Sequence, residues 1–104
     1  MVMPDAVRSL LELSKAPLDK LTRRVYNVTS FSYSAQDFQM FTEAGFPGAK
    51  ITYQPDLPRQ DIVDSWPADI DDQAARSDWG WKPEFNAEDA CQEYLLKNII
   101  THYA

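Results

Sequence analysis

The sequence predicts an α+β fold, and two observations lead to this prediction. Residues 23–29 and 49–54 are rich in β-branched and aromatic side chains, a composition typical of short strands. Between them, residues 34–46 carry apolar side chains at helical spacing behind a capping pattern. A strand, a helix and a second strand in this order indicate a βαβ unit, whose crossover is right-handed. We therefore expect one βαβ unit accompanied by further helices.

The first helix is expected at residues 4–16. Val7, Leu10 and Leu11 fall at positions i, i+3 and i+4, so they share one face, and Pro17 ends the helix. In the βαβ unit, Ser34 is the expected N-cap of the helix and Gly45 its left-handed C′ residue.

The second half of the chain is expected to be mainly helical. Residues 55–67 contain three prolines and predict an extended segment, with at most a short strand at residues 62–63. A short helix should run from residue 71 or 72 to Trp79, with Gly80 as its C′ residue and Trp81 folded back onto it. The last helix should begin after Asn86 as N-cap. Its expected buried residues are Cys91, Tyr94, Leu95 and Ile99.

Length and charge restrict the class of protein. The 104 residues are the size of one small domain or of a piece of one, and we treat residues 1–104 as a single partial domain. A net charge of −6 disfavours nucleic acid and anionic membrane surfaces as partners. One cysteine and one histidine are too few for a zinc site. No apolar run approaches the roughly 18 residues of a membrane span, so we expect a cytoplasmic protein.

The residues that a nucleotide-dependent enzyme needs are not found in this sequence. Its glycines, Gly45, Gly48 and Gly80, form no glycine-rich turn between a strand and a helix that could hold a pyrophosphate. No tyrosine has a lysine four residues later, the pair in which an ammonium group lowers the pKa of a phenol that acts as a base. Tyr94 with Lys97 is one residue short. We expect no catalytic residue, no cofactor-binding residue and no metal site in this chain.

A resemblance to a known family appears in residues 59–67, Arg-Gln-Asp-Ile-Val-Asp-Ser-Trp-Pro, followed by Asp-Trp-Gly-Trp at residues 78–81. Together with Tyr-Asn-Val-Thr at residues 26–29 and Met-Pro-Asp-Ala at residues 3–6, this pattern resembles the C-terminal part of short-chain-type L-threonine 3-dehydrogenases. The match spans residues 3–96. The Tyr-Asn stretch alone would be weak evidence, because related sugar-nucleotide epimerases share it.

The resemblance implies the substrate-side C-terminal part of an extended short-chain dehydrogenase whose Rossmann cofactor core is absent. In the intact enzyme an N-terminal Rossmann domain binds NAD and carries the catalytic Tyr and Lys. L-threonine is oxidised to 2-amino-3-oxobutanoate. The implied partners are therefore that missing Rossmann domain and L-threonine. No cofactor is expected on this chain alone. The chain should either self-associate through surfaces that the missing domain would cover or be only marginally stable.

Three residues of the signature are substrate-pocket candidates: Arg59, Ser65 and Trp66. Arg59 either lines the substrate site or fixes the Ser-Trp-Pro loop, or it makes a surface salt bridge with Asp61 or Asp64. Trp66 is either an apolar wall that excludes water from the site or a core side chain. Ser65 either hydrogen-bonds the substrate or serves as a turn residue. The aspartates Asp69, Asp71 and Asp72 are better explained by a helix N-terminus than by a metal site.

Two alternatives to a threonine dehydrogenase remain open at this point. The chain could be part of a related NAD-dependent sugar-nucleotide epimerase or dehydratase. It could also be a stand-alone interaction protein derived from such a domain.

Overall fold

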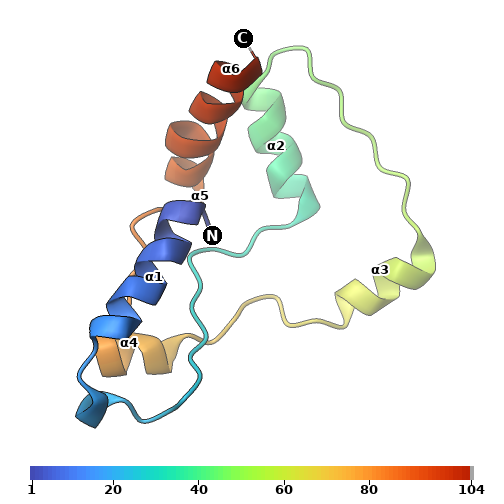
Figure 1. Cartoon of the computed structure of the whole chain (residues 1–104). Coiled ribbons are helices and arrows are strands. Elements are labelled where there is room, and N and C mark those ends of the chain that lie inside the picture. The colour runs from blue at the N-terminus through green and yellow to red at the C-terminus, as the bar shows by residue number, and fades with distance from the viewer. Residues whose placement is uncertain (104) are drawn as a thin grey trace. The chain divides into compact units, whose positions relative to one another are not determined.

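The computed structural model of the chain describes residues 1–103, which form helices joined by turns and extended segments (Figure 1). No helix in this range combines the length and the apolar character that crossing a membrane requires. In chain order the elements are α1 (Met3–Lys15), the 3₁₀ turn η1 (Leu18–Lys20), α2 (Ala35–Gly45), α3 (Leu57–Asp64), α4 (Gln73–Trp79), α5 (Ala87–Asp89), the π-helical stretch η2 (Ala90–Leu96) and α6 (Lys97–Tyr103).

The α+β prediction is not confirmed, because residues 1–103 contain no strand. Residues 23–29 and 49–54 follow irregular paths and do not pair, so the expected βαβ unit is not formed. A strand is defined by backbone hydrogen bonds to a neighbour, and β-branched composition does not supply that neighbour. Residues 62–63, expected in an extended segment, lie within α3.

The chain divides into two compact units. Unit 1 consists of residues 1–32 and 70–104, so it is built from both ends of the sequence, and unit 2 consists of residues 33–69. In unit 1 the buried apolar residues are Val2, Ala75, Trp81, Ala87, Ala90 and Cys91. Most of these side chains are small, so Trp81 supplies most of the buried apolar volume of this core.

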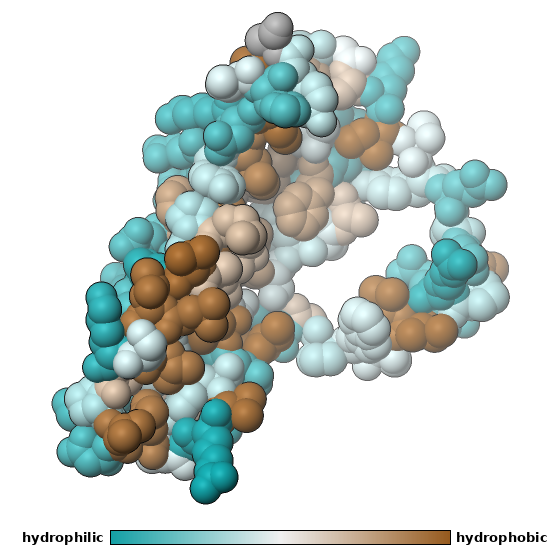
Figure 2. Space-filling model, in the orientation of Figure 1, coloured by the Kyte–Doolittle hydropathy of each residue, from teal (hydrophilic) through white to brown (hydrophobic). Residues whose placement is uncertain are grey.

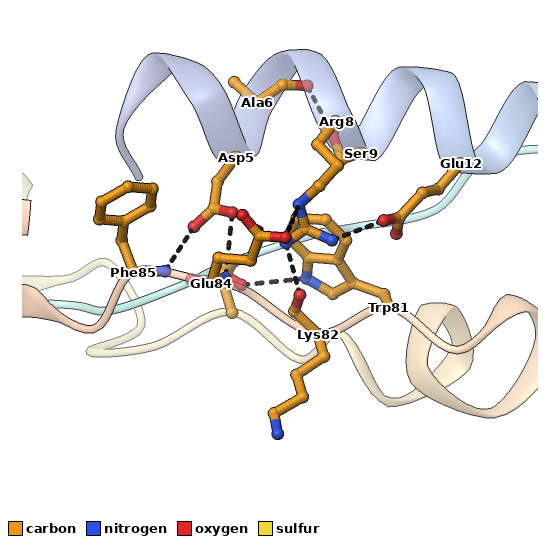
Figure 3. Close-up of polar contacts among 10 residues, drawn as sticks. Asp5, Ala6, Arg8, Ser9, Glu12, Trp81, Lys82, Glu84 and Phe85 are labelled. Atoms are coloured by element: carbon orange, nitrogen blue, oxygen red, sulfur yellow. Dashed lines mark hydrogen bonds and ion pairs between the residues drawn. The ribbon is translucent and has the colours of Figure 1, made fainter.

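Asp5 joins the first turn of α1 to the segment that precedes α5. Its side chain is fully buried, and its carboxylate accepts hydrogen bonds from the backbone N–H groups of Glu84 (3.0 Å) and Phe85 (3.1 Å), and from Arg8 (2.8 Å) (Figure 3). Burial alone raises the pKa of this carboxyl. The hydrogen bonds from Glu84, Arg8 and Phe85 outweigh that effect, so the pKa of Asp5 is lowered overall and the group is held as a carboxylate.

Arg8 and Trp81 complete this junction. The Arg8 guanidinium donates to the carbonyl oxygen of Lys82 (2.6 Å) and lies over the Trp81 ring, 4.9 Å from its centroid. The Trp81 indole N–H donates to the carbonyl oxygen of Thr29 (3.1 Å). The Trp81 side chain thus contacts two separate parts of unit 1, which are α1 and the segment at Thr29.

Several predicted helix ends are confirmed. Ser34 and Asp37 form a reciprocal capping box at the start of α2, and the Asn86 side chain accepts the Asp89 N–H at the start of α5. Gly80 ends α4 with a φ of 76°, and the Trp81 N–H donates back to the Ala75 carbonyl oxygen. The prediction of a left-handed Gly45 after the helix is wrong, because Gly45 is the last residue of α2 and Phe46 is its C-cap.

The C-terminal helix is continuous from α5 through η2 to α6 (Figure 1). Cys91 is buried as predicted, and burial raises the pKa of its thiol, so the thiol stays protonated. Leu95 and Ile99, also predicted to be buried, are exposed. The π-helical stretch contributes to this difference, because a π turn shifts the register on which a 3.6-residue pattern depends.

Unit 2 is held together by aromatic contacts and by two hydrogen bonds to the backbone. Tyr33 stacks on Phe41 with ring centroids 5.6 Å apart. The Tyr53 hydroxyl donates to the carbonyl oxygen of Ala35 (3.1 Å), and the Gln39 side chain donates to that of Ile51 (3.3 Å). These contacts tie the extended chain after α2 back onto that helix.

Candidate functional site

The candidate site is built on α3, which carries the distinctive sequence signature. Asp56 precedes this helix as its N-cap, and its carboxylate accepts the Arg59 N–H at 3.4 Å. Pro58 lies in the first turn, where a missing N–H costs no helical hydrogen bond. These local features explain why a segment with several prolines nevertheless forms a helix.

Arg59 lies in the first turn of α3 and lines a surface pocket of about 380 Å³. The pocket lining is Tyr53, Gln54, Pro55, Asp56, Arg59, Gln60 and Val63. The Arg59 Nε atom is 3.4 Å from an Asp56 carboxylate oxygen, and the Arg59 side chain is 85% exposed. The salt bridge therefore involves Asp56 and not the expected Asp61 or Asp64, and an exposed pair of this kind adds little stability.

Ser65 and Trp66 follow the last turn of α3. The Ser65 hydroxyl donates to the carbonyl oxygen of Ile62 (2.6 Å), which agrees with the turn-residue interpretation and leaves the hydroxyl oxygen able to accept. The Trp66 side chain is 66% exposed, so it is not a core residue. A tryptophan with this much apolar surface in water is a candidate for contact with something outside residues 1–103.

The structure does not bring the three candidates together. Arg59 and Val63 lie one turn apart in α3, whereas Trp66 comes after the helix and donates its backbone N–H to the carbonyl oxygen of Val63 (3.0 Å). Trp66 does not line the pocket next to Arg59. Ser65 is the C-cap of α3 and bonds to its own helix.

Sequence reasoning missed two residues of this pocket. The sequence places Tyr53 in a predicted strand, yet Tyr53 lines the pocket and its hydroxyl donates to the carbonyl oxygen of Ala35. Asp56 was not singled out, although an aspartate followed by a proline two residues later is a helix-start signal that could have identified it.

A second, more polar pocket of about 490 Å³ lies in unit 1 next to Asp78. One Asp78 carboxylate oxygen accepts hydrogen bonds from the Thr22 hydroxyl (2.6 Å), the Thr22 N–H (3.0 Å) and the Tyr26 hydroxyl (2.6 Å). These hydrogen bonds lower the pKa of Asp78, and the bond from the Thr22 hydroxyl has the largest effect. Because they come from the chain itself, we assign this carboxylate the role of fixing the loop after α1.

The residues described do not fit a dinucleotide cofactor or a metal. The starts of α2, α3 and α5 are occupied by the side chains of Ser34, Asp56 and Asn86, so a phosphate would have to compete with them. Within residues 1–103, no three His, Cys, Asp or Glu side chains are grouped to hold a metal ion. Asp71 accepts the Gln73 N–H at 2.9 Å and Asp72 pairs with Arg76, as expected for a helix start.

Comparisons with known proteins agree with the family that the sequence signature resembles. No protein-family model matches the chain. The mitochondrial L-threonine 3-dehydrogenase of Bos taurus is 38% identical over 86 residues, which are 83% of this chain and 23% of that protein. An uncharacterized epimerase/dehydratase of Staphylococcus haemolyticus is 35% identical over 100 residues, which are 95% of this chain and 31% of that protein.

Among solved structures, a monomeric L-threonine 3-dehydrogenase from a metagenome matches with a TM-score of 0.82 and 39% identity, covering 100% of this chain and 33% of that one. The chain spans about a quarter to a third of the length of the relatives it matches. Its homologues and structural neighbours are therefore L-threonine 3-dehydrogenases and epimerase/dehydratases, and it corresponds to a C-terminal part of these longer proteins.

Proposed function

We propose that this chain is the substrate-side part of an NAD-dependent L-threonine 3-dehydrogenase. The observation that carries the proposal is the similarity to such enzymes over 83% or more of the chain, together with the exposure of α3 and of the signature residues that follow it. The NAD site and the catalytic base belong to the remaining two thirds of the enzyme. Because the structural relative is described as monomeric, we place that remainder on the same polypeptide.

In this proposal α3 and the residues that follow it bind the substrate and exclude water from it, and they take part in no chemical step. Trp66 forms an apolar wall beside the reacting carbon of L-threonine. Arg59, whose side chain is largely exposed, offers a cation to the carboxylate of an amino-acid substrate. Bound NAD would accept the hydride, and no residue described here takes part in that transfer.

The purified chain is expected to show neither L-threonine-dependent NADH formation nor saturable binding of NAD. The reason is that the starts of α2, α3 and α5 are capped by its own side chains and that it has no tyrosine and lysine at the required spacing. Calorimetric titration with NAD and an absorbance assay for NADH measure both properties. A saturable NAD isotherm at micromolar concentration would refute this expectation.

Activity is expected when the chain replaces the matching third of the monomeric metagenome enzyme in a single fusion protein. The assay measures NADH formation with L-threonine, and the enzyme's own sequence serves as the reference. An epimerase or dehydratase is the second candidate, because the Staphylococcus haemolyticus relative carries that description. A fusion protein that folds and binds NAD but does not oxidise L-threonine would contradict the proposal. Nucleotide sugars would then be tested as substrates.

In the same fusion, Trp66→Ala is expected to lower kcat/KM for L-threonine by about tenfold or more, while the affinity for NAD is unchanged. Tenfold corresponds to about 1.4 kcal/mol, which one lost apolar wall can account for. Steady-state kinetics and an NAD titration separate the two effects. Trp79→Ala in α4 is the matched control for losing an indole elsewhere. Unchanged kinetics in a folded Trp66→Ala fusion would exclude Trp66 from the substrate site.

A further inference from the structure

A third pocket, of about 510 Å³, lies in unit 1 between the end of α1, the turn η1 and the end of α4. Its lining includes three of the chain's ten lysines and arginines, Lys15, Lys20 and Arg76, although the chain as a whole carries a net charge of −6. Trp79 belongs to the same lining. Figure 2 shows hydrophilic side chains beside hydrophobic ones over the part of the molecule where η1 and α4 lie in Figure 1. Cationic side chains therefore gather at one place on an acidic protein.

The two carboxylates in this lining already have partners in the chain. Glu12 accepts a hydrogen bond from the Arg8 guanidinium at 2.6 Å, and this ion pair offsets its charge. One Asp78 carboxylate oxygen accepts hydrogen bonds from the hydroxyl groups of Thr22 and Tyr26, both at 2.6 Å. Neither carboxylate therefore needs a cationic ligand, and the repulsion that an anion would meet from them is reduced.

The two lysines of the lining have no such partners. Within residues 1–103, neither the Lys15 nor the Lys20 ammonium group makes an ion pair or a hydrogen bond, and both residues are exposed. Arg76, by contrast, is held by Asp72, with 2.6 Å between the Nε atom and a carboxylate oxygen. Lys15 and Arg76 stand in the last turns of α1 and α4, where a cation offsets the negative end of a helix. Lys20 lies in η1, a single turn with a small dipole, so its charge is available to a ligand.

Trp79 adds an unpartnered donor to the pocket. Its indole nitrogen is buried and has no hydrogen-bond partner among residues 1–103. A buried donor without an acceptor costs free energy, and a bound ion is one explanation of such a group in a folded protein. The ring is held in place, because its centroid lies 6.1 Å from that of Tyr26 and 5.8 Å from that of Trp81. A ligand that accepts hydrogen bonds would satisfy this donor.

We propose that this pocket binds a phosphate group through Lys15, Lys20 and the indole N–H of Trp79. All three are donors, and an oxyanion with several acceptor oxygens can serve more than one of them at once. A phosphoryl group carries about −1.5 to −2 charges at pH 7, which favours it over a carboxylate with a single charge. The pocket is separate from the one at Arg59, and its assignment does not depend on the proposed function.

The test follows the three indole N–H resonances of the ¹⁵N-labelled chain by NMR while sodium phosphate replaces sodium chloride at constant pH and ionic strength. Trp79→Phe identifies the Trp79 resonance. We expect this resonance to shift saturably at millimolar phosphate, while that of the exposed Trp66 does not move. Lys20→Ala should raise the Kd for phosphate by roughly threefold or more, because one charge-assisted contact is lost. Lys50→Ala is the matched control, an exposed lysine of unit 2.

The remaining outcomes decide for or against the pocket. A Trp79 resonance that does not respond to phosphate would overturn the proposal. Equal effects of Lys20→Ala and Lys50→Ala would do the same, because general screening of the chain would then explain the shift. The same titration with adenosine monophosphate distinguishes two sources of the phosphate group. Tighter binding than that of inorganic phosphate would assign the site to the phosphoryl group of an organic ligand, and equal or weaker binding would assign it to free phosphate.

Discussion

Trp81→Ala is expected to lower the free energy of unfolding of this chain by about 3–5 kcal/mol. The Trp81 side chain is 2% exposed, and the residues buried around it are mostly small, so its loss leaves a cavity that they cannot fill. The substitution also removes the indole N–H from Thr29 and the ring from beneath Arg8. Urea denaturation followed by circular dichroism measures the change. The total free energy of unfolding of a small domain is about 5–15 kcal/mol, so a loss of this size should unfold much of unit 1.

Trp66→Ala is the matched control for this experiment, because it is the same substitution at an exposed position. Its effect on the free energy of unfolding should stay within about 0.5 kcal/mol. Equal effects of the two substitutions would contradict the assignment of Trp81 as the centre of the unit 1 core.

Asp5→Asn is expected to lower the free energy of unfolding by about 2 kcal/mol at pH 7, because charge-assisted hydrogen bonds are replaced by weaker ones. The pKa of Asp5 is lowered in the folded protein, so the unfolded chain binds a proton more readily. The stabilisation from this carboxylate is therefore fully present above the unfolded pKa of about 3.9 and is lost as the pH falls through the folded value. The curves for the unmodified chain and the variant should converge at acid pH.

Denaturation at a series of pH values tests this, with Asp61→Asn on the exposed surface of α3 as control. The pKa values of Asp37 and Asp78 are also lowered, so some acid sensitivity should remain in the Asp5→Asn variant. A constant difference between variant and unmodified chain at every pH would mean that the charge of Asp5 is not what stabilises the junction.

The parts of the fold that could be predicted are those decided within a few residues. The capping box of Ser34 and Asp37, the cap at Asn86 and the left-handed Gly80 each depend on side chains and backbone one turn apart. Gly45 shows the limit of this reasoning. A glycine near a helix end can adopt the left-handed conformation that follows a helix but does not have to, and here Gly45 is the last helical residue of α2.

The parts that could not be predicted depend on distant partners. Residues 23–29 have strand composition without a strand beside them. Sequence periodicity correctly grouped Val7, Leu10 and Leu11 on one face, but it could not say that this face would lie outside. The role of Asp5 depends on Glu84 and Phe85, about 80 positions further along the chain, and no local pattern reveals that contact.

The candidate site shows the same division. The signature indicates Arg59, Ser65 and Trp66, but it does not show that Arg59 lies inside a helix while Ser65 and Trp66 follow its end. Tyr53 and Arg59 line the same pocket, which lies between the segment after α2 and the start of α3. The prediction of a strand at residues 49–54 gave no indication of this pocket.

The construction of unit 1 from both chain ends has a consequence for synthesis on the ribosome. Asp5 and Glu84 are 79 residues apart, so α1 leaves the exit tunnel well before its anchoring backbone exists. At about 5–20 residues per second, this delay is roughly 4–16 s. During that interval the contacts of Asp5 with Glu84 and Phe85 cannot fix the rotation of α1, and its apolar side is available to chaperones. Unit 2, whose contacts span fewer positions, can form within that time.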